Sequence, residues 1–193
     1  MYRLSFTAGV LLHEEGRLLS ELYLSNGSWS ETIEAAKREN TLGQRAMGSS
    51  VRLVQEAKDR LLNLNEFGLR LVAFGSHTDR VLVMWYATCL RYKLIYEFAE
   101  EVIQQKGIGL QPHLDKSDIE LFFLQKELTI EELNAISPLT KGKLMQVLGK
   151  MLKEATLINE DSTVSWKIVS LELQEFNNSV QGDFSKVILA RNL

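Results

Sequence analysis

The chain of 193 residues has one cysteine, two prolines and three histidines, and this scarcity excludes several classes of structure. A single cysteine, Cys89, excludes an intrachain disulfide framework, and its place in an apolar stretch predicts a buried, unreactive thiol. His13, His77 and His113 lie far apart in the sequence, so none has the close spacing of a metal-ligand pair. His13-Glu14-Glu15 is the nearest approach to a ligand cluster, and we interpret it as the solvated face of a helix. We therefore expect no metal site and no cofactor.

Long apolar runs and catalytic constellations are also absent from the sequence. The longest charge-free apolar run, Val81 to Leu90, is about half of the roughly 20 residues that cross a bilayer, so we expect no contact with membranes and a cytoplasmic protein. Gly43 to Ser49 has the glycine spacing of a phosphate-binding loop but lacks the lysine that would hold the phosphates. Without a triad, metal cluster or nucleotide loop, we expect a protein that is not an enzyme.

Scarce proline and repeated three-and-four spacing of apolar residues predict a mainly α protein, a helical bundle. Apolar stripes over 81–92 and 95–103 predict a central pair of helices that ends at Lys106-Gly107. The hydrophobic content of 45% is enough for one substantial core or two modest ones. A segment with glycine and proline near residue 110 marks the expected boundary between an N-terminal helical domain, 1–110, and a C-terminal domain, 111–193.

In the C-terminal domain, residues that typically begin helices or form turns predict three helices and a hairpin. Two S/T-x-x-E capping boxes, at residues 117–120 and 129–132, predict helices that begin near 118 and 130. Ser137-Pro138 predicts a third start, with a helix that runs to about Ala155. Apolar runs on both sides of 159–162 predict a small β-hairpin. This layout resembles a winged-helix module, in which the last helix lies in the major groove.

The third helix of this module is expected to carry a cationic face. Its apolar residues are expected to form one buried stripe, whereas other positions carry lysine, threonine and glutamine side chains that can contact DNA. The candidate DNA-binding residues here are Thr140, Lys141, Lys143, Gln146, Lys150 and Lys153. Between Ser137 and Ile158 four lysines stand against one acid, although the whole chain has a net charge of −3. Local positive charge is typical of nucleic-acid binding, but any amphipathic helix with a solvated face shows similar lysines.

A looser three-helix layout near the N-terminus predicts a helix-turn-helix-like segment. Helices are expected over about 10–24, over 28–40 and from residue 50 onward, separated by glycine-containing turns. The start of the third helix gathers groups that suit phosphates and purine edges, namely Arg45, Ser49, Ser50, Arg52 and Gln55. Segment 1–62 has eight basic and eight acidic residues, so its overall charge does not favour DNA.

Many short pieces in a fixed order, over residues 2 to about 173, carry a family resemblance. They include Tyr2 to Gly9, Trp29, Asn40 to Arg45, Ser49-Ser50, Arg60-Leu61, Trp85, Cys89, Arg91-Tyr92, Glu97 to Ala99 and Met151-Leu152. Together they resemble the BrxA family of bacterial phage-exclusion (BREX) systems. Ala8 and His13 depart from the family pattern, which has glycine and tyrosine there. The resemblance implies a small double-stranded-DNA-binding component that works with other BREX proteins, such as a methyltransferase or an ATPase.

Two hypotheses for the function follow. The first is a non-catalytic protein that binds double-stranded DNA through both basic helix starts. The second is a protein-protein adaptor with little intrinsic DNA affinity, which the net charge of −3 fits better. For an adaptor, exposed Trp29 or Trp166 would be natural anchors. Whether the two candidate DNA-reading helices face the same side does not follow from the sequence.

Overall fold

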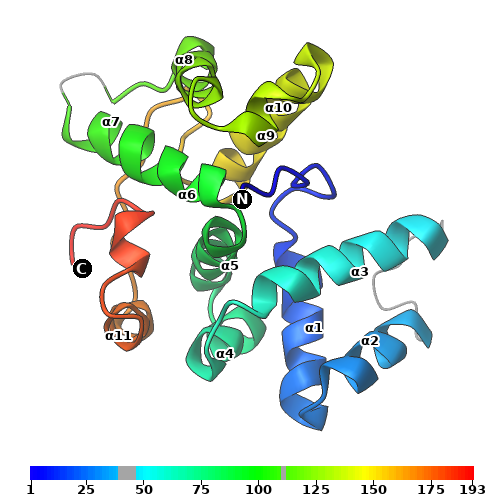
Figure 1. Ribbon diagram of the computed structural model, residues 1–193. Coiled ribbons are helices and arrows are strands. Elements are labelled where there is room, and N and C mark those ends of the chain that lie inside the picture. Colours follow the sequence, from blue (N-terminus) through cyan, green and yellow to red (C-terminus); the bar gives the residue numbers. More distant parts are fainter. Residues whose placement is uncertain (39–46, 110–111) are drawn as a thin grey trace.

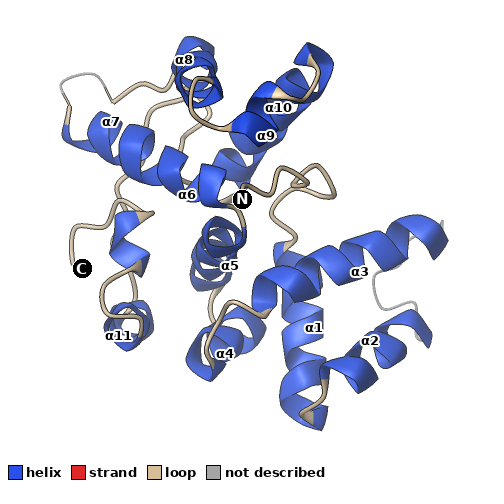
Figure 2. Cartoon of the chain, viewed as in Figure 1, coloured by secondary structure: helices blue, strands red, loops and turns tan. Residues whose placement is uncertain are grey.

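A computed structural model describes residues 1–38, 47–109 and 112–193, apart from the side chains of residues 47–50. Within these ranges the chain is mainly helical, as the sequence predicts, and its β-structure consists of isolated bridges (Figure 1 and Figure 2). The helices are α1 (His13–Asn26), α2 (Trp29–Arg38), α3 (Met47–Leu61), α4 (Glu66–Phe74), α5 (His77–Arg91), α6 (Lys93–Phe98), the π-helix η1 (Ala99–Ile103), α7 (Gln104–Ile108), α8 (Lys116–Glu127), α9 (Glu131–Asn134), α10 (Pro138–Glu154), α11 (Leu171–Ser179) and the 3-10 helix η2 (Phe184–Lys186).

Helices α1 to α4 form an N-terminal group in which α1 contacts each of the other three (Figure 1). Helix α1 ends at Asn26 because Gly27 takes a left-handed conformation, φ 71°, which a residue without Cβ adopts at little cost. The Ser28 hydroxyl accepts a first-turn backbone N–H of α2 at 3.4 Å, as the spacing predicts. Helix α4 was not predicted; the Asn65 side chain caps it by accepting a backbone N–H at 2.8 Å.

Helix α5 lies at the centre of the core. It begins with a capping box between Ser76 and Asp79, and every residue from Val81 to Cys89 is buried. With α6, η1 and α7 it forms the central pair of helices that the two apolar stripes predict. The Cys89 thiol is buried as expected, and burial raises its pKa well above the ordinary value. It therefore stays protonated and unreactive in the folded chain.

Helices α8, α9 and α10 occur where the sequence predicts three helices, but two of the predicted caps are wrong. The capping box of α8 is formed by Asp115 and Asp118 instead of residues 117–120, so the helix begins at Lys116. Helix α9 has no side-chain cap. Glu132 instead accepts the backbone N–H of Tyr2 at 2.9 Å, because the N-terminal segment packs against this end of the chain. The Ser137 cap of α10 and the proline in its first turn are confirmed.

The predicted hairpin is present only as isolated bridges. Ile158 bridges Val164, and His113 bridges Thr163, both in antiparallel fashion. The turn between them closes where Ser162 donates its backbone N–H to the Asn159 carbonyl at 3.0 Å. A few backbone hydrogen bonds of this kind do not make regular strands within the described residues.

The C-terminal segment returns to the central helices. The indole N–H of Trp85 donates to the Val187 carbonyl at 2.8 Å, and the hydroxyls of Tyr86 and Tyr96 both donate to the Asp183 carboxylate. Sequence patterns did not predict this return or helix α11. The predicted domain boundary near residue 110 stays a prediction. The hydrogen bonds of Trp85, Tyr86 and Tyr96 with the C-terminal segment join residues on its two sides. Among the described helices, none combines the length and the apolar character that a membrane span needs.

Candidate nucleic-acid interface

Helix α10 presents the predicted basic face on the surface of the molecule. One side of it is buried in the core, at Leu144, Val147, Leu148, Met151 and Leu152. On the other side Lys143, Gln146, Lys150 and Lys153 are exposed. The Thr140 hydroxyl is also exposed and lies 2.9 Å from the Ser137 hydroxyl, so it belongs to the helix cap.

The lysines of α10 differ in how free they are to meet a polyanion. Lys143 contacts only the Gln146 side-chain oxygen, at 3.2 Å, and Lys150 has no partner within the described part of the chain. Lys153 lies 3.5 Å from Glu160, whose side chain is almost fully exposed and able to swing away. These three ammonium groups are available to phosphates.

Lys141, which is also among the predicted DNA-binding residues, has an acidic partner within the protein. Its ammonium group lies 3.0 Å from the Glu127 carboxylate, and its side chain is only 15% exposed. Glu127 belongs to α8, so the pairing depends on how α8 and α10 pack and leaves no signal in the α10 sequence. Lys141 therefore holds two helices together and is not available to DNA in this structure.

Helix α3 carries the N-terminal candidates. Arg52 and Gln55 are exposed, and the Gln55 amide donates to the Asp59 carboxylate at 2.6 Å. Arg52 has no partner among the side chains that the structure describes. Arg45 lies outside the described residues, as do the side chains of Ser49 and Ser50. Arg52 is thus the free cation on the described part of this helix start.

A buried ionic cluster fixes the C-terminal half of α3 to the core. Arg60, which is fully buried, donates to Glu56 at 2.9 Å and to the backbone carbonyls of Val10 and Leu11 at 2.7 and 3.0 Å. The Tyr92 hydroxyl donates to the same Glu56 oxygen at 2.6 Å. Burial, followed by this hydrogen bond, raises the pKa of Tyr92, so its hydroxyl stays a donor.

By holding the C-terminal half of α3, this cluster sets the direction in which the N-terminal end of the helix extends. A second contact, from Arg91 of α5 to Asp59, holds the same half of the helix. Because these anchors lie toward the C-terminal end, the N-terminal half of α3 projects from the body (Figure 1). The sequence showed the Glu56-Arg60 spacing of an ordinary surface pair, and nothing in it indicated that this pair would be buried.

In Figure 1 the N-terminal ends of α3 and α10 both lie on the right-hand side of the view, and the C-terminal segment lies on the left. The N-terminal segment links the two regions, because the Leu11 backbone N–H donates to Glu154, the last residue of α10, at 2.9 Å. The C-terminal ends of both candidate helices are therefore held by the same short segment, at residues 10 and 11.

Two comparisons with known proteins name the same family. The sequence model of the BrxA family matches residues 1–179. The chain belongs to the BrxA family. A protein of Bacillus cereus (strain H3081.97) described as "BREX protein BrxA" is 24% identical over 155 residues, which cover 80% of this chain and 78% of that protein. The crystal structure of an uncharacterized protein from Magnetospirillum magneticum superposes with a TM-score of 0.84 at 18% identity, covering 97% and 98% of the two chains, and so shares the fold.

The BrxA-family chain also has apolar hollows beside its basic face. A groove of about 670 Å³ runs between α8, α10 and the 158–162 turn, with Ile119, Met145 and Ile158 in its lining and Lys150 and Lys153 at its edge. Gly142 and Gly149 of α10 also line it, and an added Cβ would meet nothing within 4 Å at Gly142. Such a groove suits an apolar side chain of a partner.

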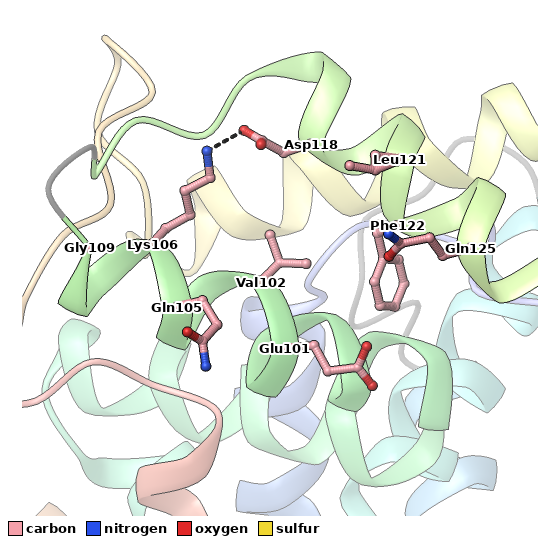
Figure 3. Close-up of a pocket in the computed structure, with 9 residues that line it drawn as sticks. All are labelled: Glu101, Val102, Gln105, Lys106, Gly109, Asp118, Leu121, Phe122 and Gln125. Carbon is pink, nitrogen blue, oxygen red and sulfur yellow. Dashed lines mark ion pairs between the residues drawn. The ribbon is translucent and has the colours of Figure 1, made fainter.

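A second hollow and the tryptophans Trp29 and Trp166 are further candidate contact sites. A hollow of about 580 Å³ lies between η1, α7 and α8 (Figure 3), and Lys106 and Asp118 form an ion pair of 2.8 Å between α7 and α8. Trp29 stacks on Tyr23 with ring centroids 4.3 Å apart, so it is packed rather than free as an anchor. Trp166 is 38% exposed, and its indole N–H donates to a backbone carbonyl.

Proposed function

We propose that this chain is a non-catalytic, double-stranded-DNA-binding component of a BREX-type antiphage defence system that acts in the cytoplasm. Membership of the BrxA family supports the defence role, because the Bacillus cereus relative is itself described as a BREX protein. The observation that carries the DNA-binding part is the exposed face of α10, where Lys143 and Lys150 have no acidic partner among the described residues.

The physical basis is electrostatic. Each lysine that neutralises a DNA phosphate releases condensed counterions, so binding weakens as salt rises. A chain with a net charge of −3 achieves this only where cations are gathered locally, as on α10. We interpret α8, α9 and α10 with the 159–162 turn as a winged-helix-like module, with α10 directed at the duplex.

The N-terminal group supplies a second contact in this proposal. Arg52 is exposed near the start of α3, and the buried Arg60 cluster keeps that helix in a fixed orientation. Two weak contacts on one rigid body hold a duplex better than either alone, because the second contact forms at high effective concentration. Sequence-independent phosphate contacts would suffice for this grip.

The test is a salt titration of duplex binding by fluorescence anisotropy, on a duplex of random sequence. The double variant Lys143→Glu/Lys150→Glu should make the slope of log affinity against log salt shallower by about 2, since each phosphate contact contributes about 0.9. Lys141→Gln is the matched control on the same helix, because its ammonium already pairs with Glu127. It should leave the slope unchanged. A folded double variant with the wild-type slope would remove α10 from the interface.

A second candidate function is that of an adaptor for another BREX protein, such as the methyltransferase or the ATPase. The observation that favours it is a row of exposed apolar side chains on and just after α8: Leu121, Leu124 and Leu128 are 54%, 60% and 83% exposed, and Leu121 also lines the hollow of about 580 Å³. Exposed apolar rows of this kind usually meet a partner. A pull-down from cells distinguishes the two functions: a partner that survives nuclease treatment, from a protein that ignores purified DNA, favours the adaptor.

A further inference from the structure

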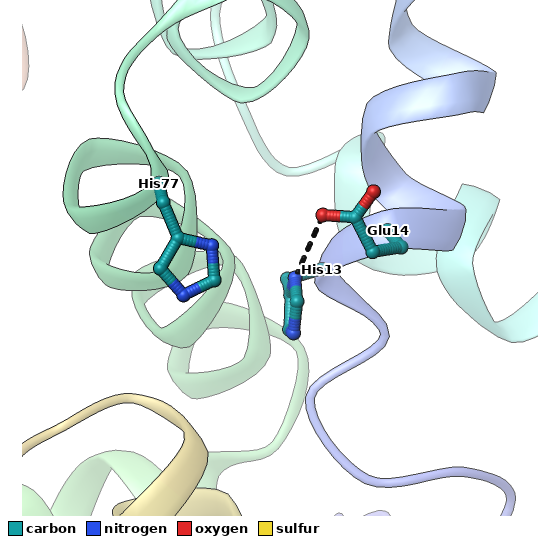
Figure 4. Close-up of side chains that lie close together, drawn as sticks. All are labelled: His13, Glu14 and His77. Carbon is teal, nitrogen blue, oxygen red and sulfur yellow. Dashed lines mark ion pairs between the residues drawn. The ribbon is translucent and has the colours of Figure 1, made fainter.

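Two histidines that are distant in the sequence meet where α1 and α5 begin. His13 is the first residue of α1 and His77 the first of α5. Their ring centroids lie 5.2 Å apart with an interplanar angle of 85°, and Figure 4 shows both rings beside Glu14. Their separation in the sequence gave no sign of this contact, because the packing of α1 against α5 brings them together.

Glu14 makes this pair a three-ligand cluster. One ligand atom from each of His13, Glu14 and His77 lies within 4.8 Å of the other two. The Nδ1 atom of His13 is buried without a hydrogen-bond partner and lies 3.3 Å from a Glu14 carboxylate oxygen. In a tetrahedral zinc site with bonds of about 2.1 Å, ligand atoms are about 3.4 Å apart. His77 is exposed, so a rotation of its side chain closes the remaining distance.

The surroundings hold the carboxylate in place. Arg17 donates to Glu14 at 3.0 Å, and Arg80 lies 3.3 Å from the oxygen that faces His13. Arg80 is itself fixed by the Val72 carbonyl at 3.0 Å. Arg17 and Arg80 together thus fix the position of the Glu14 carboxylate. Metal-binding carboxylates normally have such outer hydrogen bonds.

The local field must also allow a cation. The N-terminal ends of α1 and α5 carry partial positive charge, which disfavours the binding of a cation there. Acidic residues in the first turns of the two helices, Glu14, Glu15 and Asp79, offset this charge, while Arg17 and Arg80 add positive charge beside Glu14. Two imidazoles and a carboxylate are a ligand set that zinc takes in proteins, with the fourth position left to water.

We propose that His13, Glu14 and His77 bind one divalent transition-metal ion, with Zn²⁺ as the best match to their ligand atoms. The ion would join the first turn of α1 to the first turn of α5 and so fasten the N-terminal helical group to the central helix. Neither α3 nor α10 contributes a ligand to this site. It is open to solvent, so Zn²⁺ reaches it in the folded chain.

The test is isothermal titration of Zn²⁺ into the full chain without an affinity tag, together with the visible absorption of bound Co²⁺. The wild type should bind one ion, show tetrahedral Co²⁺ absorption and melt at a higher temperature when Zn²⁺ is present. His77→Ala should weaken Zn²⁺ binding at least roughly tenfold, since even changes in groups that only support a metal ligand cost 10- to 100-fold. His77 is exposed, so this variant should keep the wild-type melting temperature without metal.

His113→Ala is the matched control. His113 is another exposed histidine beside an acid, 3.3 Å from Asp115, but it has no second imidazole in its cluster. This variant should bind Zn²⁺ like the wild type. Equal affinity of wild type and His77→Ala, or absence of Zn²⁺ binding by the folded wild type, would overturn the proposed site.

Discussion

Replacing Arg60 by methionine should destabilise the chain far more than replacing Arg70. Both arginines follow a glutamate by four residues on a helix, but the Arg60 pair is buried, whereas the Arg70 and Glu66 side chains are 60% and 70% exposed. Methionine keeps most of the buried volume of Arg60 and removes its charge. The change leaves Glu56 buried with only Tyr92 and Arg91 as partners.

The magnitude follows from the contacts that are lost. Breaking a buried ion pair from one side costs about 3–5 kcal/mol. The carbonyls of Val10 and Leu11 also lose their donor. Against this, one Arg60 nitrogen, Nη2, is buried without a hydrogen-bond partner, so removing it relieves a penalty. We therefore expect a loss near the lower end of that range, about 3 kcal/mol.

The assay is urea unfolding followed by helical circular dichroism, for wild type, Arg60→Met and Arg70→Met. The exposed pair should lose less than about 0.5 kcal/mol, because solvent screens it. The comparison isolates burial, since residue types and helical spacing are the same in the two pairs. If Arg60→Met were no less stable than Arg70→Met, the buried cluster would not be what holds α3 in place.

Two further predictions concern stability. Burial raises the pKa of Tyr86 and Tyr96 above the ordinary value of 10.0, so their protonated forms stabilise the fold below pH 10 and this contribution is lost as pH rises beyond it. The urea concentration at the unfolding midpoint should therefore decrease as pH is raised beyond 10. The decrease should be smaller for Tyr86→Phe than for the wild type, and an equal decrease would count against this role of Tyr86. Gly142→Ala should stabilise the chain by about 0.5–1 kcal/mol, because an added Cβ meets nothing within 4 Å; a lower melting temperature would contradict this.

The proposed interface was only partly accessible to sequence reasoning. The pattern of α10 predicted its buried stripe, its Ser137 cap and its exposed lysines, because helical periodicity alone sets which residues share a face. The same pattern placed Lys141 among the DNA contacts. Its partner Glu127 lies on another helix, so only the packing of α8 on α10 shows that this lysine is occupied.

By itself, the sequence determined the helical character of the chain, most of its helix starts and the burial of Cys89. These depend on residues a few positions apart, whose relation is fixed once a helix forms. The tertiary structure alone decided that Arg60 is buried, that His13 meets His77 and that the C-terminal segment returns to Trp85. Such contacts join distant parts of the chain, and no local pattern specifies them because they depend on how whole helices pack.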